Sequence, residues 1–248
     1  MNQAKVALRV YYRDFLRMKP AWRVFDEVIV RHRESLPLIL SREEVRHLLS
    51  HVSEPKFIAC LSLIYSCGLR LSEAISVEVR DIDRAHNRLH VRCGKGGKAR
   101  YVPISTEMIK LLAKWWLMHR NPRFLFPAVG RRWRTSNRAT NEQTDTMRRE
   151  AMRKATKPMS VSTVQNALKW AIAASGIKKR VTVHTLRHCY ATHLLDEGVS
   201  LRHISSYLGH ASLNQTLVYA HLSAVSEHRT QEALSGLYRS VIARKKKP

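Results

Sequence analysis

The chain has 248 residues, of which 44% are hydrophobic, enough for one large domain or for one domain with a fragment of another. Its 44 lysines and arginines against 19 acidic residues give a formal net charge of +25, which favours an anionic partner, above all nucleic acid. No apolar run reaches the ~18 residues that a transmembrane helix needs, and the N-terminus lacks the hydrophobic segment of a signal peptide. The sequence therefore argues against a membrane or secreted protein and predicts a cytoplasmic one.

The four cysteines agree with this location. Cys60, Cys67, Cys93 and Cys189 form no C-x-x-C pair and no spacing typical of a secreted disulfide framework. Three of them lie in apolar surroundings, so we expect buried free thiols in a reducing compartment.

The first predicted elements are helices. Residues 4–18 form an amphipathic pattern, which a polar, basic connector follows up to residue 36. Ser41 with Glu44 three residues later predicts a capping box at the start of the next helix. A mostly apolar helix is expected over 55–68, with a proline at its start and a glycine at its end, and then a short helix over 71–77.

The sheet signal lies at residues 88–104. Leu89, Val91 and Cys93 alternate with polar residues, which is the pattern of a half-buried strand. The glycine-rich turn 94–98 and the segment ARYVPI then predict an antiparallel hairpin. The expected fold class is therefore mainly α with a small antiparallel β-sheet.

The rest of the chain is predicted to be helical apart from one insertion. The segment 127–160 is polar and non-periodic, so we expect a basic loop or a partly ordered insertion there. The expected helices cover 106–119, 161–175, 184–197, 201–208 and about 223–243, before a basic tail.

Three side chains in VTVHTLRHCYATHLL share one helical face: His184, Arg187 and His188. Two histidines four residues apart could bind a metal ion, whereas a histidine and an arginine could bind a phosphate. A third metal ligand and an H-E-x-x-H pattern are missing, and the charge of Arg187 opposes a dication beside it. The pattern favours an anion over a metal-dependent hydrolase, predicts no metal site, and leaves His188 as a structural residue.

Three further segments concentrate reactive side chains, each with a plain structural alternative. Arg70 and Glu73 in GLRLSE could be a surface ion pair. Lys95 in CGKGGKAR lies on a turn that lacks the spacing of a nucleotide-binding P-loop and could be a solvated hairpin. His210 and Tyr219 in YLGHASLNQTLVYAHL could simply pack in the core.

In their order, GLRLSE, GKGGKARYVPI, HTLRHCYATHLL and LGHASLNQTLVYAHL resemble the catalytic domain of the tyrosine recombinase (phage integrase) family, nearest the integron-integrase and chromosome-dimer-resolvase branch. The resemblance covers residues 36–222 and implies that family's catalytic-domain fold. It assigns catalysis to Arg70, Lys95, His184, Arg187, His210 and the nucleophile Tyr219, with Glu73 and His188 in support. The basic residues expected to contact DNA are Lys98, Arg100, Lys178, Lys179 and Arg180.

The resemblance implies a site-specific DNA recombinase that forms a 3′-phosphotyrosyl intermediate on double-stranded DNA, as a homotetramer and without cofactor or metal. Tyr219 would attack the phosphodiester, with His184 as base and Lys95 as acid for the leaving 5′-oxygen. The arginines and His210 would stabilise the charge of the transition state.

The domain organisation departs from the family pattern at the N-terminus. Residues 1–35 resemble only the last helix and linker of a core-binding domain, ahead of the catalytic domain at 36–222 and a C-terminal helix and tail at 223–248. A truncated DNA-binding remnant that has lost catalysis is therefore the alternative function.

Overall fold

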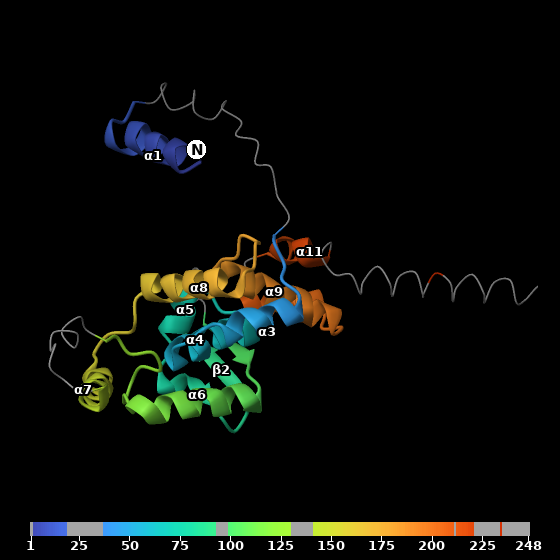
Figure 1. Ribbon diagram of the computed structural model, residues 1–248. Coiled ribbons are helices and arrows are strands. Elements are labelled where there is room, and N and C mark those ends of the chain that lie inside the picture. Colours follow the sequence, from blue (N-terminus) through green and yellow to red (C-terminus); the bar gives the residue numbers. More distant parts are fainter. Residues whose placement is uncertain are drawn as a thin grey trace, which may run out of the picture. The chain divides into compact units, whose positions relative to one another are not determined.

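The computed structural model describes residues 2–18, 37–92, 99–129, 141–210, 212–220 and 234 (Figure 1). The chain divides into two compact units, Met1–Leu36 and Pro37–Pro248. The predicted helix 223–243 and the predicted turn 94–98, which carries Lys95 and Lys98, lie outside the described residues except for Leu234.

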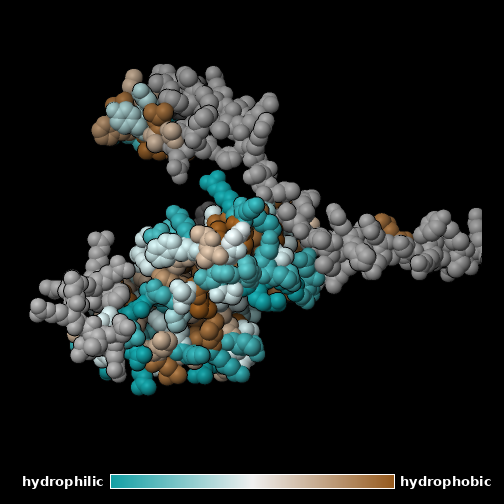
Figure 2. All heavy atoms as spheres, in the orientation of Figure 1, coloured by the Kyte–Doolittle hydropathy of each residue, from teal (hydrophilic) through white to brown (hydrophobic). Residues whose placement is uncertain are grey.

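The first unit contains the helix predicted over 4–18. It consists of α1 (Asn2–Val10), which continues as a π-helical turn over Tyr11–Phe15. Its apolar side chains lie largely at the surface, with Val6 59% and Phe15 75% exposed (Figure 2). The assignment of this unit as part of a core-binding domain stays a prediction.

The second unit is mainly helical, which confirms the predicted fold class. Ser41 caps the first of its helices in the predicted capping box, since Glu44 N donates to Ser41 Oγ and Ser41 N donates to the Glu44 carboxylate. The described helices are α3 (Arg42–Ser50), α4 (Pro55–Cys67), α5 (Leu71–Ile75), α6 (Thr106–His119), α7 (Asn141–Lys154), α8 (Val161–Ser175), α9 (Val183–Asp196), α10 (Leu201–Leu208) and α11 (Asn214–Ala220).

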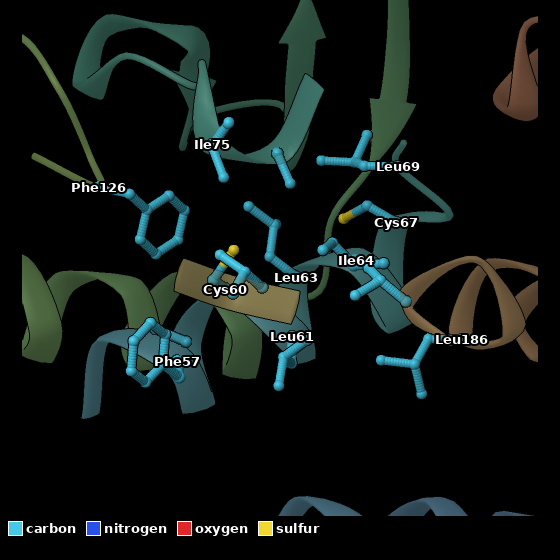
Figure 3. Packing of buried hydrophobic residues seen from close by; sticks show 14 of the residues in the cluster. Phe57, Cys60, Leu61, Leu63, Ile64, Cys67, Leu69, Ile75, Phe126 and Leu186 are labelled. Atoms are coloured by element: carbon cyan, nitrogen blue, oxygen red, sulfur yellow. The ribbon is translucent and has the colours of Figure 1, made fainter. Parts of the chain in front are cut away.

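Helix α4 forms the centre of this unit. It contacts α3, α5, α6, α8 and α9, and it is apolar nearly all round because neighbours cover most of its surface. Ile64 of α4 and Leu186 of α9 belong to the same buried cluster (Figure 3), so the core extends to the helix that carries His184 and Arg187. The other residues labelled in the cluster are Phe57, Cys60, Leu61, Leu63, Cys67, Leu69, Ile75 and Phe126.

The sheet has three antiparallel strands, β1 (Ile82–Asp83), β2 (Arg88–Val91) and β3 (Arg100–Pro103), in the order β1-β2-β3. The hairpin of β2 and β3 confirms the prediction, with Leu89 opposite Val102 and Val91 opposite Arg100. Strand β1 was not predicted, because two residues are too short to establish an alternating pattern.

The expected loop over 127–160 is wrong in its second half, where α7 covers Asn141–Lys154. Its composition explains both the helix and the missed prediction. Arginine, glutamate, methionine and alanine are good helix formers, but Met152 is the one buried side chain among residues 144–154, which gives no apolar period. Asn121 binds the end of this helix by donating from Nδ2 to the carbonyl oxygens of Met152 and Ala155 at 2.8 and 2.9 Å.

Among the described residues, no helix is both long enough and apolar enough to cross a membrane.

Gly68 and Gly176 allow a matched test of how tightly the core is packed around the end of α4. Both end a helix at positive φ, +61° and +70°, where an L side chain costs about 1–2 kcal/mol. A Cβ at Gly68 would overlap the Tyr190 ring and lie 3.0 Å from Leu208, whereas a Cβ at Gly176 would meet nothing within 4 Å. We expect Gly176→Ala to lower the free energy of unfolding by about 1–2 kcal/mol and Gly68→Ala by about 2–5 kcal/mol, measured by urea denaturation. Equal losses for the two variants would contradict this packing.

Candidate active site

Five of the six predicted catalytic residues are described, and they come from three places in the second unit. Arg70 precedes α5, His184 and Arg187 lie on α9, and His210 and Tyr219 follow α10. Helix α9 contacts α4, α10 and α11, so it forms the common support for these segments. The left-handed Gly68 ends α4 and turns the chain toward Arg70.

Arg187 is the most deeply buried charged residue of this group, with 1% of its surface exposed. Its Nη1 donates to the carbonyl oxygen of Gly68 at 2.6 Å and its Nη2 to that of Leu208 at 2.7 Å. Burial, followed by the positive charge of Arg70, lowers the pKa of Arg187 to about 10. The side chain remains charged at neutral pH and joins the end of α4 to the end of α10.

Glu73 is a buried carboxylate that several arginines share. It accepts from Arg70 Nη1 at 2.8 Å, and its Oε2 lies 3.9 Å from Arg187 Nη1. Burial alone would raise the pKa of Glu73, but hydrogen bonds from Arg100 and Arg70 outweigh burial and lower the pKa below its ordinary value. The ion pair of Arg70 and Glu73 is therefore only partly at the surface: the Glu73 carboxylate is buried, while the Arg70 side chain is 23% exposed.

Arg100 corrects a sequence prediction. It was expected to contact DNA, but its side chain is only 9% exposed and donates to both carboxylate oxygens of Glu73, at 3.0 and 2.8 Å. The alternation of β3 was a usable signal, because Arg100 shares a face with the buried Val102 and, further on, Ile104.

Tyr219 lies on α11 and is 2% exposed. Its hydroxyl is 2.9 Å from Nδ1 of His188, and the His188 ring contacts the His184 ring edge-on at 4.5 Å between centroids. Burial raises the pKa of Tyr219, and burial, followed by the nearby His184 and Arg187, lowers the pKa of His188 to about 4. His188 therefore contacts the hydroxyl as a neutral ring, and it lies closer to the reactive group than the sequence predicted.

His184 and His210 lie on the two sides of this contact. Burial and then the charges of Arg187 and Arg70 lower the pKa of His184. His210 Nδ1 is 2.8 Å from the hydroxyl of the fully buried Thr216, and its ring is nearly parallel to the Tyr219 ring at 6.5 Å. Burial, followed by Arg187 and Arg70, lowers the pKa of His210 to about 4.

The basic residues expected to contact DNA separate into groups. Lys178 and Arg180 are exposed in the connection between α8 and α9, as a phosphate contact requires. Lys179 is exposed as well, but its Nζ pairs with Glu44 at 2.6 Å. Lys95 and Lys98 lie outside the described residues.

The site is suited to an anion. Arg70 and Arg187 bring two positive charges close together, and the charge of Arg187 also acts on the Tyr219 hydroxyl. The pKa values of about 4 leave His188 and His210 neutral at pH 7, and able to exchange a proton. In the described part of the chain, His, Cys, Asp and Glu side chains form no group of three or more that could hold a metal ion.

Comparison with known proteins identifies the chain. The model of the phage integrase family matches residues 39–225. An integrase/recombinase of Escherichia coli is 30% identical over 263 residues, which cover 95% of this chain and 74% of that protein. The chain belongs to the phage integrase family.

Other relatives in the phage integrase family are longer than this chain. Two proteins of Sinorhizobium fredii are 35% identical over 190 residues, and the chain spans 54% and 66% of their lengths. Tyrosine recombinase XerC of Pelobacter propionicus is 32% identical over 224 residues, which cover 88% of this chain and 67% of that protein.

Solved structures of phage integrase family members share the fold. The crystal structure of XerA recombinase has a TM-score of 0.60 at 22% identity and covers 92% of this chain and 81% of that one. The Tn1549 transposon integrase, solved with circular intermediate DNA, has a TM-score of 0.66 at 17% identity and covers 94% and 78%.

The half-buried His188 and His210 predict a pH-dependent stability. The pKa values of His188 and His210 in the folded protein are about 4, below the ~6.5 of an unfolded histidine. Between these values the unfolded chain binds protons that the folded chain excludes, so the free energy of unfolding should fall as the pH drops from about 6.5 to about 4. NMR titration of the ring signals, with urea denaturation at pH 7 and pH 5, measures both effects. Replacing both residues with glutamine should make the free energy of unfolding less dependent on pH. Ring signals of His188 and His210 that titrate near ~6.5 would contradict the prediction.

Proposed function

We propose that this chain is the catalytic part of a site-specific recombinase that cuts and rejoins double-stranded DNA through a 3′-phosphotyrosyl intermediate. The observation that carries the proposal is that five candidate residues lie close together, with Tyr219 and Arg187 buried, Arg70 and His210 half-buried and His184 exposed. Membership of the phage integrase family supports it.

In the proposed reaction, Tyr219 Oη attacks the phosphorus of one phosphodiester. A bond from Oη to phosphorus forms, the bond from phosphorus to the 5′-oxygen breaks, and the DNA is left with a 3′-phosphotyrosine and a 5′-hydroxyl. Attack by a 5′-hydroxyl of a second strand reverses these changes, so the reaction conserves the number of phosphodiester bonds and needs no external energy source. Lys95 is proposed as the acid for the leaving oxygen, and it lies outside the described residues.

Arg70, Arg187 and His210 are proposed to bind the non-bridging oxygens. Negative charge accumulates on these oxygens in the transition state, where preorganised donors contribute most. Arg187 is held at two of its nitrogens by backbone carbonyls, so its orientation is set before DNA binds. Arg70 is 23% exposed at its side chain and remains accessible to an incoming phosphate.

His184 is proposed as the base, with His188 holding the nucleophile in the DNA-free protein. Tyr219 is 2% exposed, so its hydroxyl cannot reach a phosphate until α11 moves and the contact with His188 opens. His184 is influenced by both Arg187 and Arg70, which supports a location on the phosphate side of the histidine pair. DNA binding would therefore be coupled to release of Tyr219.

Double-stranded DNA is the proposed partner, bound by a homotetramer. The net charge of +25 and the exposed Lys178 and Arg180 support a DNA partner, and the XerH recombinase of similar fold was solved on its difH substrate. We also infer that the chain lies near the integron-integrase and chromosome-dimer-resolvase branch, which its similarity to proteins named XerC and XerA supports. Residues 1–35 are proposed to be the end of a core-binding domain.

A covalent trapping assay tests the central proposal. Duplexes selected for binding from a randomised pool would carry a bridging 5′-phosphorothiolate, whose thiolate leaves without an acid and does not readily rejoin. We expect wild-type protein to form an adduct that survives denaturing electrophoresis and Tyr219→Phe to form none. An adduct with Tyr219→Phe would refute the nucleophile assignment. Salt-sensitive DNA binding without any wild-type adduct would instead favour the non-catalytic DNA-binding remnant.

The same assay distinguishes the proposed roles of His184 and His188. We expect His184→Gln to lower the cleavage rate about 10²–10⁴-fold, because a general base is lost. His188→Gln should lower it less, because that residue contacts the hydroxyl in the buried state. Rates measured from pH 5 to pH 9 would check this, and a larger loss with His188→Gln would exchange the two roles.

A further inference from the structure

Arg100 at the start of β3 has no part in the reaction proposed so far, although its guanidinium is the most fully paired of those around Glu73. Its side chain is 9% exposed, and a buried guanidinium is costly unless its donors are satisfied. The groups that accept hydrogen bonds from Arg100 belong to two segments of the candidate active site.

The first contact is a two-pronged pair with Glu73. Nη1 and Nη2 of Arg100 donate to separate oxygens of the carboxylate at 3.0 and 2.8 Å, a geometry that fixes the plane of the carboxylate. Glu73 Oε1 also accepts from Arg70 Nη1, and Oε2 accepts from the Arg70 backbone N at 2.8 Å. The orientation of Arg70 therefore depends on a carboxylate that Arg100 holds.

The second contact is with the C-terminal end of α10. Arg100 Nε donates to the Tyr207 carbonyl oxygen at 2.7 Å. The next two carbonyls accept from the other arginines: Leu208 from Arg187 at 2.7 Å, and Gly209 from Arg70 at 3.5 Å. Three guanidinium groups thus lie at three successive carbonyls, where a helix has unpaired acceptors and a partial negative charge.

Gly209 makes this arrangement possible. It has a φ of +63°, and a Cβ there would lie 3.1 Å from both Cδ and Nη1 of Arg100. The chain can therefore pass directly against the guanidinium and continue to His210, whose backbone N donates to the Ser205 carbonyl oxygen at 3.2 Å.

We propose that Arg100 is a positioning residue, which joins Glu73 to the end of α10 and thereby orients Arg70 and His210 for the phosphate. This inference rests on the proposed function. Arg100 does not contact the phosphate in this role. Without the Arg100 guanidinium, only Arg70 and Arg187 would neutralise the negative charge of Glu73. Their N–H donors would then turn toward the carboxylate and away from an incoming phosphate oxygen.

The rate ratio between two substrates tests the proposal. A methylphosphonate at the cleaved position replaces one non-bridging oxygen with methyl, so it has no negative charge for Arg70 to neutralise. Arg100→Lys cannot form the two-pronged pair, so we expect it to lower the rate of phosphodiester cleavage about 10²-fold. The loss in the rate of methylphosphonate cleavage should be smaller than this by a factor of at least about 10. Arg84→Gln, which removes one charge from the exposed turn between β1 and β2, should change neither rate.

This ratio is independent of the fraction of protein that folds, since both substrates use the same preparation. A merely structural role would lower both rates equally, and that result would overturn the proposal, as would full activity of Arg100→Lys. In a double-mutant cycle, Glu73→Gln with Arg100→Gln should cleave no more slowly than Glu73→Gln alone. Losses that multiply would mean that Arg100 does not act through Glu73.

Failure of the proposed function is distinguishable, because wild-type protein would then cleave neither substrate. The positioning of Arg70 can still be measured in the DNA-free protein from the NMR signal of its Nε–H group. Arg100→Lys should shift or broaden that signal, whereas Arg84→Gln should leave it unchanged. An Arg70 signal identical in wild type and Arg100→Lys would overturn the proposal whatever the cleavage assay gives.

Discussion

The sharing of one buried carboxylate among arginines is the interaction on which the rest of the site depends. Glu73 is 3% exposed at its side chain and lies within hydrogen-bonding distance of Arg70 and Arg100, with Arg187 close by. A buried carboxylate with one partner would gain little, because desolvation offsets the attraction, but a network that satisfies every oxygen is worth more than its separate pairs. The end of α10 completes this network with three backbone carbonyls.

The same network explains the electrostatics of the neighbouring side chains. Three guanidinium groups against one carboxylate leave an excess of positive charge in a partly desolvated site, where interactions are weakly screened. Protonation of His184, His188 and His210 is therefore opposed both by burial and by the arginines, and all three pKa values fall. A phosphate would relieve this excess, and neutral histidines can exchange protons beside it.

The nucleophile candidate lies in a different environment from the arginines. Tyr219 packs in a small cluster with Tyr190, Ala191, Ile204 and Leu208, apart from the main core. Burial there raises the pKa of the hydroxyl, which stays protonated and in contact with His188. A small peripheral cluster buries less apolar surface than the main core, so α11 can be released at a lower cost in free energy.

Local patterns in the sequence determined most of the elements and indicated the candidate catalytic residues. Capping boxes, helix-ending glycines and the alternation around Leu89 act over a few neighbouring residues, so they can be read without knowing what packs against them. The order of four motifs was enough to indicate the phage integrase family. Helix α7 was not predicted because its residues have high helix propensity but show no apolar period, and contacts such as the ion pair of Arg148 with Glu54 leave no pattern in the local sequence. Only the tertiary structure decided that the Arg100 guanidinium is buried against Glu73 and Tyr207, 27 and 107 residues away in the chain. It also decided that His188 rather than His184 contacts the Tyr219 hydroxyl, 31 residues away, because burial and partner choice depend on how distant segments of the chain pack together.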